Sequence, residues 1–207
     1  MGQIEQSLLS SNAHHRRRIH VLHGLGGIGK TQLAIAYARK QQERYSAILW
    51  LNGNSRDTLV QSLAVFAQHA EIDGTHDPYT NAVRHGQELL EKAKAVLRWL
   101  ALEGNYRWLL VYDNVDRDYQ AEPEDQQAYD LESFFPVSDH GSILITTRLP
   151  HLGEYGSTTN VTSVDREQGR QILRNNVRAC LSTPGNRIPQ LLVGPSELKD
   201  KQTWTAS

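Results

Sequence analysis

The sequence predicts an α/β fold, with a roughly five-stranded, mostly parallel sheet covered by helices on both faces. Short apolar runs alternate with segments of helical periodicity along residues 19–180, as in strand, helix, strand units. Polar residues follow several of these runs, at the end of the strands where ligands bind in such sheets. The chain has 207 residues, which is enough for one domain of this kind.

A glycine-rich segment follows the first predicted strand, which begins at Ile19. The segment from Gly24 to Thr31 reads GLGGIGKT and satisfies the pattern G-x-x-x-x-G-K-[ST]. Glycines allow the backbone to wrap around an anion, and the helix that follows directs its positive end at the same point. We therefore predict a loop that binds nucleotide phosphates. The predicted contact residues are Gly24, Gly26, Gly27, Ile28, Gly29, Lys30, Thr31 and Gln32.

Two side chains of this loop have distinct predicted roles. Lys30 reaches the β- and γ-phosphates as a point charge, and the Thr31 hydroxyl is placed to ligate Mg²⁺. The alternative is a glycine-rich turn with a solvated lysine. The strand before the loop and the helix after it favour the phosphate loop over that alternative.

The remaining elements follow from hydrophobic periodicity and length. Helical spacing predicts helices over residues 30–42, 55–70 and 80–102, and again from about residue 165. Apolar runs predict strands at residues 47–51, 108–112, 141–148 and 160–164. A short helical turn is expected at residues 134–136, and a loop at residues 73–78.

The two ends of the chain differ in character from its middle. Residues 1–18 form a polar and basic lead-in, which we expect to be poorly ordered or helical. Residues 19–180 form the predicted nucleotide-binding core. Residues 181–207 combine several prolines with no periodicity, so an irregular tail is predicted there.

Two charged residues stand at the ends of predicted strands. Asp113 ends the run WLLVYD, and a carboxylate at the tip of a buried strand is how folds with a phosphate loop hold magnesium. A capping or turn aspartate is the alternative. Arg148 ends ILITTR and is predicted to sense the γ-phosphate through a bidentate contact, the alternative being a surface arginine.

The bulk composition excludes several classes of partner. Lys and Arg total 22 against 23 Asp and Glu, so no global field attracts nucleic acid or an anionic membrane. Cys180 is alone, which rules out an internal disulfide and favours a reducing compartment. The first residues lack the apolar region of a secretion signal, and no run reaches membrane-spanning length. We expect a cytoplasmic protein with no nucleic-acid or membrane partner.

Four segments, in this order and spacing, resemble the NB-ARC domain of the STAND class of P-loop NTPases. They are HGLGGIGKTQLA, ILWLN, WLLVYDNVD and GSILITTR. The sequences ILWLN and WLLVYDNVD are most similar to those of fungal NLR-like members. The resemblance covers about residues 17–178. It implies a P-loop NTPase fold that binds ADP or ATP with Mg²⁺ as a slow switch, and self-association in a full-length context.

The resemblance also assigns roles to residues and shows departures from the pattern. It implies that Asp113 holds Mg²⁺ through water and that Arg148 reads the γ-phosphate. Asn114 stands where many relatives carry a second acidic residue that polarises the attacking water, and an amide cannot take up a proton. Asp116 is the candidate substitute. The helical lid of relatives is absent, so we interpret the chain as a core cut off soon after Cys180.

These observations lead to one functional hypothesis and two alternatives. The first is an ADP/ATP-binding switch module of an NLR-like signalling protein, at most a slow ATPase, with Asp113, Asp116 and Arg148 as its catalytic candidates. The second is an active ATPase of AAA-like type. The third is a truncated remnant with weak or no nucleotide binding.

Overall fold

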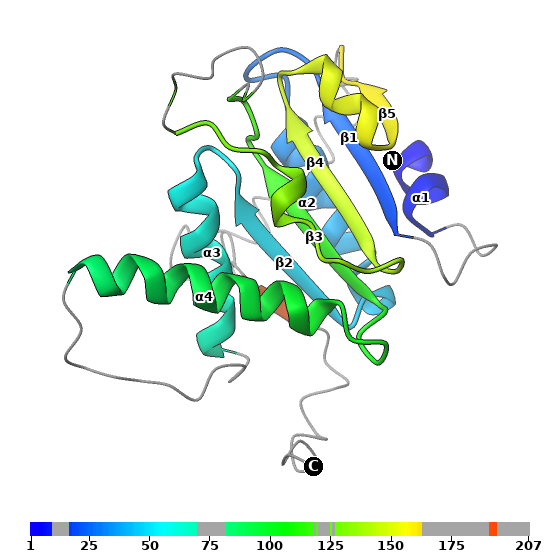
Figure 1. The fold of residues 1–207 in the computed structure, drawn as a ribbon. Helices are drawn as coiled ribbons and strands as arrows, with labels where there is room; N and C mark the ends of the chain where they lie inside the picture. The colour runs from blue at the N-terminus through cyan, green and yellow to red at the C-terminus, as the bar shows by residue number, and fades with distance from the viewer. Residues whose placement is uncertain are drawn as a thin grey trace, which may run out of the picture.

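A six-stranded sheet forms the centre of the protein, in the order β5-β1-β4-β3-β2-β6 (Figure 1). The computed structural model describes residues 1–9, 17–69, 82–117, 119, 125, 127–162 and 191–193. The strands are β1 (Arg18–His23), β2 (Ala47–Asn52), β3 (Trp108–Asp113), β4 (Ser142–Thr147), β5 (Ser157–Asn160) and β6 (Leu191–Val193). Strands β1 to β5 are parallel, and β6 runs antiparallel to β2. The predicted α/β fold with a mostly parallel sheet is confirmed.

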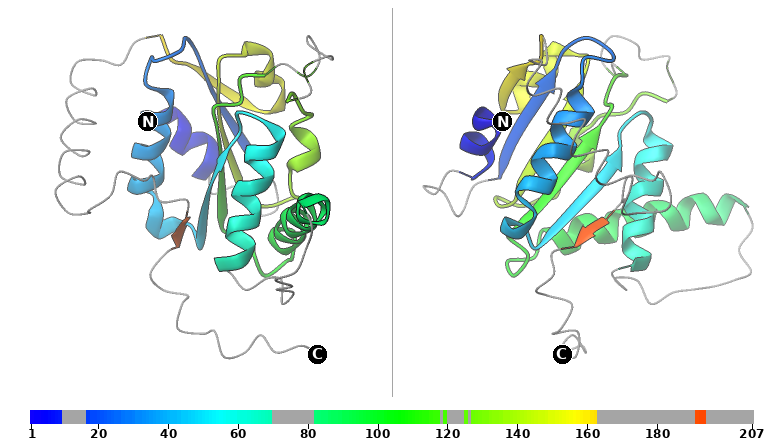
Figure 2. Two further views of the ribbon diagram at one scale, coloured as in Figure 1. Left: turned by 90° about the vertical axis from the view of Figure 1, so that its left-hand side faces the viewer. Right: turned by 180° about the vertical axis from the view of Figure 1, so that it is seen from behind.

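Helices cover both faces of this sheet (Figure 2). One face carries α1 (Gly2–Leu9) and α2 (Lys30–Lys40), and the other carries α3 (Arg56–His69) and α4 (Ala82–Leu100). The described residues also form three short 3₁₀ helices: η1 (Gln42–Arg44), η2 (Glu132–Phe134) and η3 (Pro150–Tyr155). Because the central strands are buried on both faces, they are continuous apolar runs rather than alternating ones, as the β3 sequence WLLVYD illustrates.

The connections from β1 and β4 leave the sheet toward opposite faces. The chain after β1 enters α2, whereas the chain after β4 enters η3, whose Leu152 packs into the core beneath α3 and α4. The two strands are neighbours, with His23 paired to Thr147 at their carboxyl ends. This is a topological switch point, the place where parallel α/β sheets bind ligands. The predicted phosphate loop begins there.

The first nine residues are part of the folded core. Ile4 and Leu8 of α1 are each 1% exposed and pack against the face that also carries α2. Glu5 accepts hydrogen bonds from Lys40 and Gln41 at the end of α2. The lead-in was expected to be poorly ordered or helical, and the structure shows a helix with a buried side.

No helix among the residues with described positions is long and apolar enough to cross a membrane.

The last parallel strand lies elsewhere than predicted. The sequence places it at residues 160–164, which is wrong, because β5 spans Ser157–Asn160. This edge strand is mostly exposed and has no apolar residue to mark it. Val161 supplied the apolar signal, but it follows the strand and donates its N–H to the carbonyl of His23.

Other predicted segments have mixed outcomes. The short turn near residue 134 is η2, whereas η3 was not predicted. Strand β6 pairs with β2 inside the segment for which an irregular tail was predicted. The predicted loop at residues 73–78 and the predicted helix from residue 165 lie outside the residues that the structure describes.

Candidate phosphate-binding site

The glycines of the loop are required by its backbone geometry. Gly27 (φ +74°) and Gly29 (φ +103°) adopt left-handed conformations that side chains disfavour. A Cβ on Gly24 would lie 2.5 Å from the carbonyl oxygen of Val161. Gly29 is also the N-cap of α2 and offers no side-chain cap, so the N–H groups of the first helical turn remain available to an anion.

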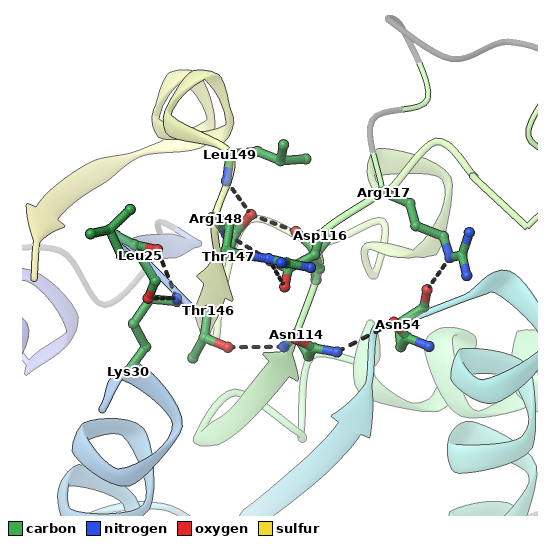
Figure 3. A network of polar contacts seen from close by, with 12 residues as sticks. Leu25, Lys30, Asn54, Asn114, Asp116, Arg117, Thr146, Thr147, Arg148 and Leu149 are labelled. Carbon is green, nitrogen blue, oxygen red and sulfur yellow. Dashed lines mark hydrogen bonds and ion pairs between the residues drawn. The ribbon is translucent and has the colours of Figure 1, made fainter. Parts of the chain in front are cut away.

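The side chain of Lys30 is bonded to the backbone of the loop. Its Nζ donates to the carbonyl oxygens of Gly24 (2.8 Å) and Leu25 (2.9 Å). Figure 3 shows the bond to Leu25. The side chain is 8% exposed. Burial lowers the pKa of the Lys30 amine; nearby Asp116 opposes this effect and Arg148 adds to it. A bound phosphate would replace the carbonyl oxygens as the partner of this buried cation and favour its charged form.

Asp113 joins the end of β3 to the start of α2. Its Oδ1 accepts hydrogen bonds from the hydroxyls of Thr31 (2.8 Å) and Thr146 (2.6 Å). The predicted magnesium residues Thr31, in the first turn of α2, and Asp113, at the end of β3, therefore lie in contact, although β4 separates β1 from β3 in the sheet. Both bonds end on Oδ1 and neither uses Oδ2. A hydroxyl and a carboxylate fit Mg²⁺, which takes its remaining ligands from phosphate and water.

Thr146 is a site residue that the sequence analysis did not assign. Besides donating to Asp113, its Oγ1 accepts the backbone N–H of Asn114 at 2.9 Å. Thr146 and Thr147 are buried at the end of the strand SILITT, directly after three apolar residues. Two hydroxyls at the carboxyl end of a buried strand are the signal that could have identified them, since buried polar groups need partners.

Asn114 has a left-handed backbone (φ +66°) directly after β3. Its Nδ2 donates to Oδ1 of Asn54, in the loop after β2, at 3.3 Å. Figure 3 shows the Asn114 amide on the side of Asn54 and away from Lys30. The amide at the position of the expected acidic residue is thus engaged with the neighbouring loop.

Asp116 and Arg148 form an ion pair beside the phosphate loop. The Oδ1 of Asp116 accepts the backbone N–H of Arg148 at 2.6 Å, and Oδ2 accepts Nε at 2.7 Å. The Asp116 side chain is 7% exposed and that of Arg148 is 59% exposed. Arg148 Cδ lies 3.7 Å from where a Cβ on Gly26 would stand. Arg148 therefore lies next to the loop.

Most predicted site residues lie together at this edge of the sheet. The glycines, Lys30 and Thr31 face Asp113 and Arg148 across the ends of β1, β4 and β3, and Gln32 lies in the first turn of α2. Ile28 instead packs against the apolar core on the α2 face, where it supports the loop. The roles of all these residues toward a nucleotide stay predictions.

No family model matches the sequence. The chain is 24% identical over 150 residues to a nucleotide-binding leucine-rich repeat (NLR)-like protein of Hyaloscypha variabilis, and the match covers 69% of this chain and 14% of that protein. A chain in the structure of Drosophila ORC bound to GC-rich DNA and Cdc6 has a TM-score of 0.44 and 14% identity, covering 89% of this chain and 61% of that chain.

The fold and the loop together define the coarse class of the protein. A parallel sheet carries a glycine-rich loop between β1 and α2, and a carboxylate from β3 is bonded to the threonine of that loop. This arrangement is that of a P-loop NTPase-like α/β fold.

Proposed function

We propose that the protein is an ADP/ATP-binding switch module of an NLR-like signalling protein, of NB-ARC type, with slow or absent hydrolysis. The hydrogen bond from Thr31 to Asp113 (2.8 Å) carries the proposal. It unites the phosphate loop with a carboxylate 82 residues further along the chain, as magnesium binding in a P-loop nucleotide site requires.

Each group of the site has a part in holding the nucleotide. The N–H groups of the loop and of the first turn of α2 bind the phosphates, and Lys30 adds the positive charge. Thr31 and Asp113 would hold Mg²⁺, which neutralises phosphate charge when bound. Arg148 lies beside Gly26 and would contact the γ-phosphate.

Two observations support a switch over an active enzyme. Asn114 occupies the position where relatives carry an acidic residue, and its amide is bonded to Asn54. Asp116, the candidate substitute, has both oxygens engaged by Arg148. An amide cannot take up a proton from water, and the ion pair with Arg148 favours the ionised form of Asp116, whose side chain is only 7% exposed, so both residues are poor candidates for the general base. The NLR-like name of the Hyaloscypha variabilis relative is consistent with the proposal.

Identification of the nucleotide that the purified protein releases on denaturation is the first test. Saturating ADP or ATP with Mg²⁺, at about 100 times the dissociation constant, should add about 2.7 kcal/mol of stability. This corresponds to a rise in melting temperature of about 5–11 °C. Lys30→Ala should abolish the rise, whereas Lys40→Ala, at the exposed far end of α2, should retain it.

The same proteins separate the alternatives. A protein that carries no nucleotide and shows no shift with ADP or ATP is the remnant, and the proposal is then refuted. Steady phosphate release that disappears in Lys30→Ala and Asp113→Ala would identify an active ATPase. Release below about 10⁻² per second, far under ordinary enzyme turnover, fits the switch.

A further inference from the structure

The geometry of the pair formed by Asp116 and Arg148 suggests different roles for the two side chains. We propose that Asp116 is a positioning residue, which holds Arg148 beside the phosphate loop with the terminal nitrogens of its guanidinium directed to the γ-phosphate. Asp116 then determines how well the site distinguishes ATP from ADP. The inference rests on the proposed function and names the residue on which its preference for the triphosphate depends.

The carboxylate of Asp116 leaves the terminal nitrogens of Arg148 unused. Asp116 accepts the backbone N–H and the Nε–H of Arg148, and neither bond involves Nη1 or Nη2. The carboxylate therefore restrains the arginine at its backbone and at the inner edge of the guanidinium. The outer edge, with its parallel N–H groups, keeps the geometry that suits a phosphate.

The carboxylate of Asp116 is itself held in a fixed position. The segment after β3 is tied to the end of β4, because Val115 donates its N–H to the carbonyl of Thr146 at 3.0 Å. The hydroxyl of Thr147 donates to the carbonyl of Val115. Asp116 follows directly and is 7% exposed. A side chain on a rigid support can orient its partner accurately.

Arg148 is exposed to solvent and lies close to the phosphate loop. The Arg148 side chain is 59% exposed, so without the carboxylate it would sample many rotamers, and a phosphate would have to immobilise it. Its Cδ is already 3.7 Å from the Cβ position of Gly26. The charges of both residues also affect the pKa of Lys30, which Asp116 raises and Arg148 lowers. Both side chains are therefore close enough to act on a charged group of the phosphate loop.

The proposal predicts an effect on the third phosphate alone. ADP lacks the γ-phosphate, so Asp116→Ala should weaken binding of a non-hydrolysable ATP analogue about five- to tenfold, the effect of one side chain that is no longer preorganised. Affinity for ADP should change less than about twofold. Arg148→Ala should weaken the analogue at least as much, and the double variant should be no weaker than Arg148→Ala alone.

Titration calorimetry on the full chain with Mg²⁺ measures these affinities. Asp125→Ala is the matched control, because it removes the carboxylate of another ion pair at the same edge, with Arg117 at 2.7 Å. It should leave both affinities unchanged. Asp116→Asn, which keeps the shape of the side chain, should show a loss in the same direction and replaces Asp116→Ala if that variant does not fold.

Several results would overturn the inference. An unchanged ratio of ATP-analogue to ADP affinity in Asp116→Asn and Asp116→Ala would show that Asp116 does not act on the γ-phosphate. Tighter analogue binding would mean that Asp116 competes for the arginine, and additive losses in the double variant would mean that the two residues act separately. A parent protein that binds neither nucleotide refutes the proposed function, and this role with it.

Discussion

Replacing Thr146 with valine preserves the shape of the side chain but removes the hydroxyl at the centre of the site. That hydroxyl donates to the Asp113 carboxylate (2.6 Å) and accepts the N–H of Asn114 (2.9 Å). A hydrogen bond to a charged group contributes about 1.5–3 kcal/mol, and a backbone N–H left without its partner costs about 1–3 kcal/mol when buried. Asn114 is exposed, so water can replace part of the second bond. We expect the free energy of unfolding to fall by about 2–4 kcal/mol.

Urea and thermal unfolding of parent and variant test this expectation. A loss of about 3 kcal/mol corresponds to a fall in melting temperature of about 6–12 °C in a protein of this size. Thr158→Val is the control, since Thr158 is exposed on β5 and should change stability by less than about 0.5 kcal/mol. If Thr146→Val unfolds within about 0.5 kcal/mol of the parent, the argument that Thr146 holds Asp113 in place is wrong.

Two further predictions concern a buried histidine and two glycines. Burial lowers the pKa of His20 to about 4 in the folded protein. Below about pH 6.5 the unfolded chain binds a proton at His20 and the folded protein does not, so the free energy of unfolding falls as the pH falls toward 4. Urea unfolding should show a loss of about 2 kcal/mol between pH 7 and pH 4.5 that His20→Asn lacks; an equal loss in both proteins would contradict the assignment. Gly24→Ala would place Cβ 2.5 Å from Val161 O and should remove the nucleotide-dependent thermal shift. Gly86→Ala in α4, where no described atom lies within 4 Å of the added Cβ, should keep the shift and raise stability by about 0.5–1 kcal/mol.

The parts of the site that depend on local pattern were predictable from the sequence. Gly24, Lys30 and Thr31 lie within one short segment, which supplies the turn, the positive charge and the hydroxyl group of a phosphate loop. Asp113 and Arg148 follow apolar runs, and the carboxyl ends of parallel strands meet at one edge of the sheet. Their proximity therefore follows once the runs are interpreted as parallel strands.

The contacts that the sequence analysis missed depend on the order of strands in space. Thr146 reaches Asp113 because β4 lies beside β3, which the order along the chain does not state. Asp116 meets Arg148 after a left-handed turn at Asn114, and asparagine adopts that conformation only in some contexts. The position of β5 was missed because an exposed edge strand needs no apolar residues to pack.

The central place of β4 restricts how the length of this chain can vary. The strand pairs with β1 and β3 at once, with Thr146 level with Leu22 and Ile145 level with Tyr112. Because side chains alternate along a strand, an insertion of one residue within β4 would bring Ile145 to the position of Thr146 and remove the hydroxyl that bonds Asp113. The same shift would draw Arg148 away from Asp116, so a single length change would disable two parts of the site. Homologues that keep this site should therefore differ in length in their loops and conserve the number of residues from Ser142 to Arg148.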